Sequence, residues 1–419
     1  MFQDTELWFV EDASALGKTV EALSRAKVIG VDTEGDSFHH YREKVCLIQF
    51  SDLERDYIVD PLSVGDISSL APIFADDSVV KVLHGADYDV VSLRRDFGFQ
   101  IHNIFDTMIA AQMLAMPRIG LADLIGETFD IVIDKKYQRH DWARRPLKHE
   151  HIEYARGDTH FLLALHEILL RKLKRSRRLN RVVEECKLLE KREWEGRAFD
   201  PDGYLRIKGS SGLSDVAKRV LRRLYLFRNE QAKKQDRPAF KVLPDYVLLE
   251  TAKAQPADMA SLDKVFSGKA VMKRRYGTRL VDAVVQGLED DFPVPTASRR
   301  KPRSKAKGGP KPVARLSGRA AERALLALKD WRNDKMKALS MTPLGVVPNN
   351  VLKGIARARP VDEKELLAVP ELRRWQVDEY GEEILEVLES VVPAAEIGQQ
   401  SEEPSGKRRR RRRRRTTTT

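Results

Sequence analysis

Residues 28–34 read Val28-Ile-Gly-Val-Asp32-Thr-Glu34, and this run of apolar and β-branched residues predicts a short buried β-strand. Asp32 and Glu34 are two residues apart at its end, so their side chains point to the same face of the strand. Unpaired charges are costly at the end of a buried strand, which sets these two acids apart from ordinary surface carboxylates. The stretch therefore predicts a strand that carries a functional pair of carboxylates.

Two further segments each place an acid beside apolar residues. Asp89 closes the segment His84-Gly-Ala-Asp-Tyr-Asp89, and Asp158 follows Tyr154-Ala-Arg-Gly. Helical spacing predicts one stripe formed by Tyr154, Asp158, Leu162 and Leu165. Carboxylates that pack together repel one another unless a cation separates them, and hard divalent cations prefer oxygen ligands. Two such ions about 4 Å apart can stabilise the attacking and leaving oxygens of a phosphoryl displacement. The pattern predicts a metal-dependent nuclease.

The composition limits the class of protein. A chain of 419 residues with 42% apolar residues can build one large domain or two to three ordinary ones. It has no apolar stretch of the roughly 20 residues that a membrane span needs, and its N-terminus has no signal-peptide pattern. Cys46 and Cys186 are its only cysteines, too few for a zinc cluster or a disulfide framework. We expect a protein of the reducing cytoplasm without membrane association.

The positive charge of the chain is concentrated in two segments. Eight basic residues and no acid lie in 299–315, and nine more form the run 407–415. Removing these seventeen positive charges from the net charge of +12 leaves −5 for the rest of the chain. A basic segment of this kind is either an electrostatic anchor for nucleic acid or a solvated low-complexity end.

Strand and helix signals alternate in residues 1–205. The strand-like runs are 28–32, 46–50, 57–60 and 79–83, and the helical patterns are 89–97 and 106–114. The mixture predicts an α/β domain in which helices pack against a sheet.

The second half of the chain contains an internal repeat with an ungapped offset of 104 residues. It aligns Leu226-Phe-Arg-Asn229 with Asp330-Trp-Arg-Asn333 and continues to Tyr276-Gly277 and Tyr380-Gly381. Both copies have apolar residues at helical spacing, so we expect two small all-α modules at 212–292 and 316–393. Residues 293–315 are expected to form a flexible linker, and residues 394–419 a disordered tail.

The acids and the repeat together resemble ribonuclease D, whose nuclease domain has an Asp-Glu-Asp-Asp 3′→5′ exonuclease site. The repeat resembles the helicase-and-ribonuclease-D C-terminal (HRDC) module, here in two copies. Two segments are especially similar to the exonuclease subunit of the eukaryotic nuclear exosome: the one from His84 to Gly98, and Asp134-Lys-Lys-Tyr-Gln-Arg-His-Asp-Trp-Ala-Arg-Arg-Pro-Leu147. The resemblance implies a ribonuclease-H-like exonuclease domain, a mixed sheet flanked by helices, followed by two HRDC domains.

The resemblance also selects the site residues. The family ligand lies five residues after the histidine, which favours Asp89 over Asp87, expected to be a surface acid. Members of the superfamily carry either a tyrosine four residues before the last aspartate or a histidine five residues before it. Those positions are Tyr154 and Glu153 here, so the chain resembles the tyrosine subclass. The nearby His149 and His151 are expected to be solvent-exposed helix residues.

In this reading Asp32, Glu34 and Asp158 hold one Mg²⁺ or Mn²⁺ that carries the attacking water, and Asp32 and Asp89 hold a second ion. Tyr154 orients the water. His84, Lys135 and Lys136 are candidates for contacts to the nucleic-acid backbone, with ordinary structural roles as the equal alternative. Asp106 is either a recurrent family feature or a helix N-cap, and His166 is expected to be structural.

The resemblance implies action on RNA with a single-stranded 3′ end, with tRNA precursors as the leading candidate, and we expect a monomer. A 3′→5′ DNA exonuclease of repair type is the nearest alternative, although the chain lacks the Gly-rich loop ending in Gly-Lys-Ser/Thr of a helicase motor. A non-catalytic RNA-binding scaffold is the alternative from a different class.

Overall fold

The computed structural model describes residues 5–194, 196, 199–266, 270–295 and 318–392. The predicted tail and nearly all of the predicted linker lie outside these ranges. The chain divides into two compact units, which are considered separately. One comprises Met1–Met108, Gly120–Leu169 and Cys186–Lys307; the other comprises Ile109–Ile119, Leu170–Glu185 and Gly308–Thr419. None of the helices in the described ranges has the length and apolar character needed to cross a bilayer.

A mixed six-stranded sheet in the order β1-β4-β3-β2-β5-β6 forms the centre of the first unit. Its strands are β1 (Glu6–Val10), β2 (Val28–Gly35), β3 (Val45–Ser51), β4 (Arg55–Val59), β5 (Val80–Leu83) and β6 (Ile104–Asp106). The strands β2, β3 and β4 form an antiparallel meander, and β1, β5 and β6 add to it in parallel. All seven residues of β3 are buried, as expected for a central strand covered on both faces.

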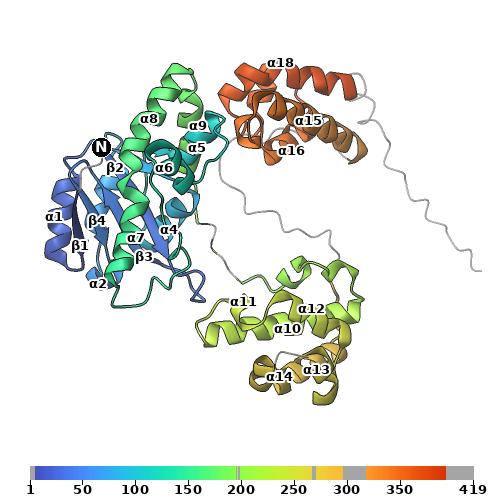
Figure 1. The fold of residues 1–419 in the computed structure, drawn as a ribbon. Helices are drawn as coiled ribbons and strands as arrows, with labels where there is room; N and C mark the ends of the chain where they lie inside the picture. Colours follow the sequence, from blue (N-terminus) through green and yellow to red (C-terminus); the bar gives the residue numbers. More distant parts are fainter. Residues whose placement is uncertain (1–4, 195, 197–198, 267–269, 296–317, 393–419) are drawn as a thin grey trace, which may run out of the picture. The chain divides into compact units, whose positions relative to one another are not determined.

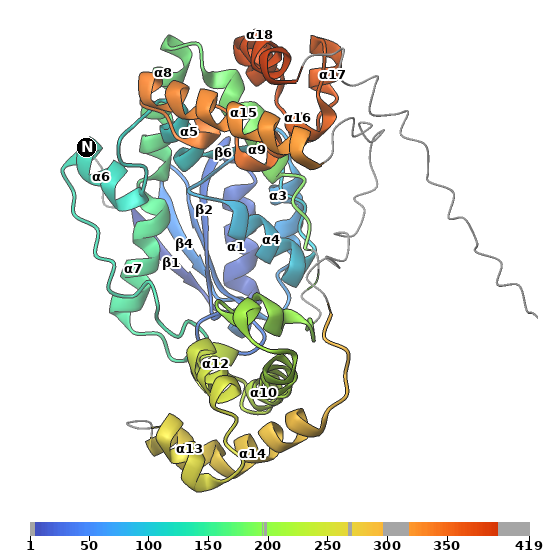
Figure 2. The same ribbon diagram turned by 90° about the vertical axis from the view of Figure 1, so that its right-hand side faces the viewer.

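Helices cover both faces of this sheet (Figures 1 and 2). The helices of this part of the chain are α1 (Ala13–Leu23), α2 (Pro61–Val64), α3 (Ala71–Ala75), α4 (Asp87–Phe97), α5 (Thr107–Met113), α6 (Leu121–Phe129), α7 (His149–His160), α8 (Leu162–Arg175) and α9 (Leu179–Leu189). Of these, α5, α8 and α9 lie partly in the second unit. Figure 2 shows α7 on one side of the sheet, and α1 and α4 on the other. Helix α7 packs across β2, β3 and β4. The predicted α/β fold class is confirmed.

Three details of the sequence prediction were incomplete or wrong. The edge strands β1 and β6 were not predicted. The predicted stripe from Tyr154 to Leu165 does not lie on one helix, because α7 ends at His160 and α8 begins at Leu162. Leu162 and Leu165 are buried on α8 instead. His151 is buried rather than solvent-exposed; its ring packs against that of His140 at 3.9 Å between centroids, whereas His149 is exposed as expected.

Helices α10 (Asp215–Lys234), α11 (Ala239–Val242), α12 (Asp245–Ala254), α13 (Met259–Val265) and α14 (Ala270–Glu289) form the first helical module. In the second unit, α15 (Gly318–Leu339), α16 (Asn349–Ala358), α17 (Glu363–Leu367) and α18 (Arg374–Val391) form the second module. Each module buries a tyrosine at the same repeat position, Tyr276 and Tyr380.

The repeat preserves a polar contact as well as an apolar core. In the first module the buried Arg228 donates to the Leu243 carbonyl at 3.0 Å and to Asp245 at 2.6 Å. In the second module Arg332 donates to the carbonyl of Val347 at 3.5 Å and to Asn349 at 2.8 Å. All three positions are 104 residues apart, so the two modules fix their first helix to the start of α12 or α16 in the same way.

Candidate active site

The strand β2 presents the first two candidate residues. In the antiparallel pairing with β3, Asp32 lies opposite Gln49 and Glu34 lies opposite Leu47. Paired residues on neighbouring strands point to the same face, and this face is the one that α7 covers. Gly30, on the same face, allows the close approach, because a Cβ there would lie 3.1 Å from the backbone oxygen of Thr159 on α7.

The third candidate, Asp89, lies in the first turn of α4 and is only 6% exposed. Thr33 of β2 donates a hydrogen bond from Oγ1 to Oδ1 of Asp89 at 2.5 Å, which ties the helix to the strand between Asp32 and Glu34. Asp87 is exposed and pairs with Arg192 at 2.9 Å, as expected for a surface acid. The structure therefore favours Asp89 over Asp87 as the residue that faces the strand.

Asp106 fixes the loop that precedes α4. Its buried carboxylate accepts backbone hydrogen bonds from Gly85 at 3.1 Å, Ala86 at 2.8 Å and Met108 at 2.8 Å. It therefore caps the start of α5 and holds the turn from which α4 begins. The N-cap explanation for Asp106 is sufficient.

Helix α7 supplies Tyr154 and Asp158, one helical turn apart and both half-buried. The Tyr154 ring packs edge-on against Tyr137 at 5.8 Å and lies 5.9 Å from the Trp142 ring. Burial raises the pKa of the Tyr154 hydroxyl, and the carboxylates of Asp158 and Glu34 raise it further. Its hydroxyl is therefore a protonated hydrogen-bonding group at neutral pH.

The four carboxylates interact electrostatically although they come from three separate elements. Burial raises the pKa of Asp158 to about 7, and the charge of Asp89 adds to the effect. Burial raises the pKa of Asp89 to about 6, against the lowering effect of the Thr33 hydrogen bond. Asp32 and Glu34 have pKa values well above the usual range, first from burial and then from the charges of the other acids. The fold thus brings all four predicted acids into one mutually repelling group.

Oxygen donors of this kind suit a hard divalent cation. Within the described ranges no set of three or more His, Cys, Asp or Glu side chains is already arranged around one ion position. The buried Gln49, opposite Asp32, also has a side-chain amide without a hydrogen-bond partner in the part of the chain described. The clustered acids and this unsatisfied amide fit a site that takes a cationic ligand. Sequence reasoning missed Gln49, because a lone glutamine in an apolar strand gives no signal of chemistry.

The predicted nucleic-acid contacts lie in two different places. His84 is half-buried, its Nδ1 lies 2.9 Å from Oγ1 of Thr107, and burial lowers its pKa. Lys135 and Lys136 are exposed, with Lys136 over the Tyr137 ring at 4.9 Å. A cavity of about 460 Å³ is lined by Lys136, Tyr137 and Tyr154, so Lys136 shares a hollow with a candidate site residue.

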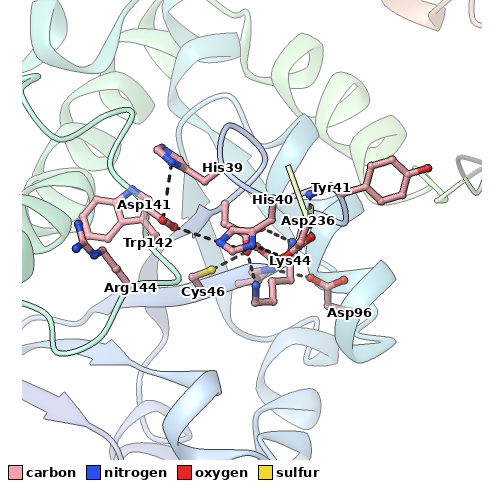
Figure 3. Close-up of polar contacts among 12 residues, drawn as sticks. His39, His40, Tyr41, Lys44, Cys46, Asp96, Asp141, Trp142, Arg144 and Asp236 are labelled. Atoms are coloured by element: carbon pink, nitrogen blue, oxygen red, sulfur yellow. Dashed lines mark hydrogen bonds and ion pairs between the residues drawn. The ribbon is translucent and has the colours of Figure 1, made fainter. Parts of the chain in front are cut away.

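A polar cluster holds the loop between β2 and β3 (Figure 3). His40 lies with Nδ1 at 2.7 Å from Asp236 and Nε2 at 3.4 Å from Asp141. The backbone N–H of Lys44 donates to Asp36 at 2.8 Å. Asp236 lies between α10 and α11 of the first helical module, so the loop that follows the Asp32–Glu34 strand is in polar contact with that module. The sequence contained no signal for this contact.

Comparison with known proteins agrees with this geometry. A family model described as "3'-5' exonuclease" matches residues 8–174, and one described as "HRDC domain" matches residues 217–284 and 321–388. The fold and its carboxylate group thus define a 3′-5′ exonuclease domain followed by HRDC domains.

Individual relatives support a narrower assignment. The crystal structure of the catalytic core of RRP6 from Trypanosoma brucei is 34% identical, covers 69% of this chain and 81% of that one, and superposes with a TM-score of 0.62. Ribonuclease D of Desulfotalea psychrophila is 28% identical over 81% of this chain and 88% of its own length. The exosome complex component 10 homolog of Caenorhabditis elegans is 34% identical over 62% of this chain, but the match spans only 30% of that relative. The chain belongs to the family of 3′-5′ exonuclease proteins that includes RRP6 and ribonuclease D.

Proposed function

We propose that this chain is a divalent-metal-dependent 3′→5′ exoribonuclease that releases nucleoside 5′-monophosphates from the 3′ end of RNA. The observation that carries the proposal is the electrostatic coupling of Asp32, Glu34, Asp89 and Asp158, which come from β2, α4 and α7. Asp89 is buried and the other three acids are half-buried, and such a mutually repelling group is costly to a folded protein unless a cation compensates its charge. Membership in the family of RRP6 and ribonuclease D supports RNA as the substrate class.

In the proposed site Asp32, Glu34, Asp89 and Asp158 hold two Mg²⁺ or Mn²⁺ ions. Bound ions of this kind lower the pKa of water and stabilise the charge that develops on the leaving 3′-oxygen. Side chains of the protein hold the attacking water and the metal ligands in position. Tyr154 donates a hydrogen bond from its protonated hydroxyl and orients the attacking water, and the Thr33 hydrogen bond holds Asp89 toward the strand. Lys136 contacts the RNA backbone beside Tyr154, and His84 and Lys135 are further candidates for backbone contacts.

We further propose the domain division 1–205, 212–292, 293–315, 316–393 and 394–419, in which the two HRDC modules hold RNA beyond the active site. Backbone contacts of this type position RNA without reading its bases. Structured RNA with a single-stranded 3′ tail, such as precursor tRNA, is the proposed substrate. A cytoplasmic location and a monomeric state stay predictions from the sequence.

The test compares one RNA oligonucleotide in linear and circular form with a DNA oligonucleotide of the same sequence, in Mg²⁺ or Mn²⁺. We expect degradation of the linear RNA, and none of the circular RNA, because an exonuclease needs a free end. Preferential degradation of the linear DNA would support the alternative of a repair-type DNA exonuclease. Cleavage of the circular RNA would contradict an exonuclease. Tight RNA binding without degradation would support the non-catalytic scaffold.

A further inference from the structure

Asp56 is a buried acid on β4 that none of the site assignments uses. Its side chain is 1% exposed, and four side chains donate to its two carboxylate oxygens or lie within hydrogen-bonding distance of them. Arg156 Nε donates to Oδ2 at 2.7 Å, and His160 Nδ1 lies 2.8 Å from the same oxygen. Ser51 donates to Oδ1 at 2.5 Å, and Thr5 donates to Oδ2. A carboxylate with this many partners is a fixed anchor rather than a solvated charge.

Two of these partners lie on α7 and flank Asp158 at two residues on either side. Ser51 makes a third connection between Asp56 and α7. Its Oγ also lies 2.8 Å from Oγ1 of Thr159, the residue that directly follows Asp158. Asp56 and Ser51 are cross-strand partners on β4 and β3. The last turn of α7 is therefore bound to the hairpin end of β3 and β4 by polar contacts on both sides of the candidate metal ligand.

This face of α7 also has close apolar packing. Ala155 and Thr159 are buried against the sheet, and Gly30 of β2 lets the backbone of Thr159 approach. Apolar packing of a helix on a sheet tolerates small sliding and rotation, whereas charge-assisted hydrogen bonds have a defined direction. The contacts to Asp56 therefore fix the rotation of α7 about its axis, and this rotation decides where Tyr154 and Asp158 point.

We propose that Asp56 is a positioning residue for the nuclease reaction: through Arg156, His160 and Ser51 it holds α7 so that Asp158 and Tyr154 face Asp32 and Glu34. The inference rests on the proposed function. Asp56 itself contacts neither substrate nor metal. Its effect is transmitted by the orientation of one helix, and displacement of a reacting group by about 1 Å costs roughly 100-fold in rate.

The test measures kcat and KM for a linear RNA, and hydrogen exchange of the α7 amides, in the full chain. In Asp56→Asn we expect kcat to fall about 10- to 100-fold with KM changed by less than about twofold. Exchange should become faster in 149–160 and stay unchanged in α1. Arg156→Gln should lower kcat in the same way. The double variant Asp56→Asn/Arg156→Gln should lose little more than either single variant, because both substitutions break the same contact between Arg156 and Asp56. Arg156→Lys should recover part of the activity.

Leu23→Ala is the matched control for lost stability, because it creates a cavity under α1 and leaves every polar contact of α7 intact. At a temperature well below all melting transitions it should keep the kcat of the wild type. Unchanged kcat or unchanged α7 exchange in Asp56→Asn would overturn the inference, as would an equal loss of kcat in Leu23→Ala. A wild-type protein without nuclease activity would instead refute the proposed function. Faster α7 exchange in Asp56→Asn would then show that the anchor exists but serves another purpose.

Discussion

Thr33 on β2 donates a hydrogen bond to Asp89 on α4 at 2.5 Å, and both side chains are buried. This contact joins two of the three elements that carry the acids. Thr33→Val keeps the shape of the side chain and removes the donor, so Asp89 keeps its burial but loses a charge-assisted partner. We expect the free energy of unfolding to fall by about 2 kcal/mol, measured by urea denaturation at neutral pH.

Thr19→Val is the control for this substitution. Thr19 is also fully buried, but its hydroxyl donates to a backbone carbonyl, that of Ala15, at 2.9 Å. Loss of this neutral hydrogen bond should cost about 1 kcal/mol or less. Equal losses in the two variants would mean that the hydrogen bond to Asp89 has no special strength.

Asp106→Ala should be strongly destabilising for a different reason. The substitution removes the acceptor of three backbone N–H groups, two of which, those of Gly85 and Ala86, lie in the turn before α4. Buried donors without partners are costly, and we expect a loss of about 3 kcal/mol in urea denaturation. Asp12→Ala, which removes the exposed N-cap of α1, should cost only about 1 kcal/mol. A smaller loss for Asp106→Ala than for Asp12→Ala would refute this role.

The contribution of Asp56 to the free energy of unfolding should be lost at acid pH. Burial on its own would raise the pKa of Asp56, but hydrogen bonds from His160, Ser51, Thr5 and Arg156 lower it to about 2. The folded-state pKa is thus below the unfolded value of about 4, so the stabilisation is present above pH 4 and is lost as the pH falls toward 2. The loss should be about 2 kcal/mol in the wild type. Between pH 2 and 5, the free energy of unfolding measured by urea denaturation should fall less steeply with falling pH in Asp56→Asn than in the wild type. An unchanged slope would contradict the assigned contacts.

Gly287→Ala should destabilise the first helical module. A Cβ at this position of α14 would lie 2.5 Å from the Cα of Val220 on α10, so the two longest helices of the module would have to separate. We expect a loss of about 2 kcal/mol or more by thermal or urea unfolding. Gly17→Ala in α1, where a Cβ would meet no atom within 4 Å, should instead stabilise by about 0.5–1 kcal/mol. Tolerance of Gly287→Ala would mean that the helices are less closely packed.

Much of the nuclease domain could be predicted from the sequence, because its central strands are strongly apolar and its acids interrupt them. The continuous apolar runs that predict strands at 28–32, 46–50 and 57–60 come from burial on both faces, and the structure has strands at all three. The strands β1 and β6 were missed for a physical reason. Three of the five residues of β1 are only half-buried, and β6 has only three residues, too few for a periodic signal.

The site was predictable only in part. The two acids on β2 share a face by strand geometry alone, and the structure agrees. Nothing in local sequence requires α7 to lie over that strand; this depends on Gly30 and on the contacts of Asp56, which are tertiary. The break at Phe161 between α7 and α8 has no proline or glycine to mark it, so helical spacing wrongly joined the two helices. The burial of His151 depends on packing against His140 and could not be read from its helix.

The most direct test of the proposed site is a time course with 5′-labelled RNA, run with Mg²⁺, with Mn²⁺ and with chelator, in the wild type, Asp32→Asn and Asp158→Asn. RNA binding is measured in parallel. We predict a metal-dependent ladder that shortens from the 3′ end with release of nucleoside 5′-monophosphates. Both variants should lose at least about 1000-fold in rate and keep their affinity for RNA. Shortening that continues in chelator, or in either variant at the rate of the wild type, would contradict the assignment of these carboxylates to the active site.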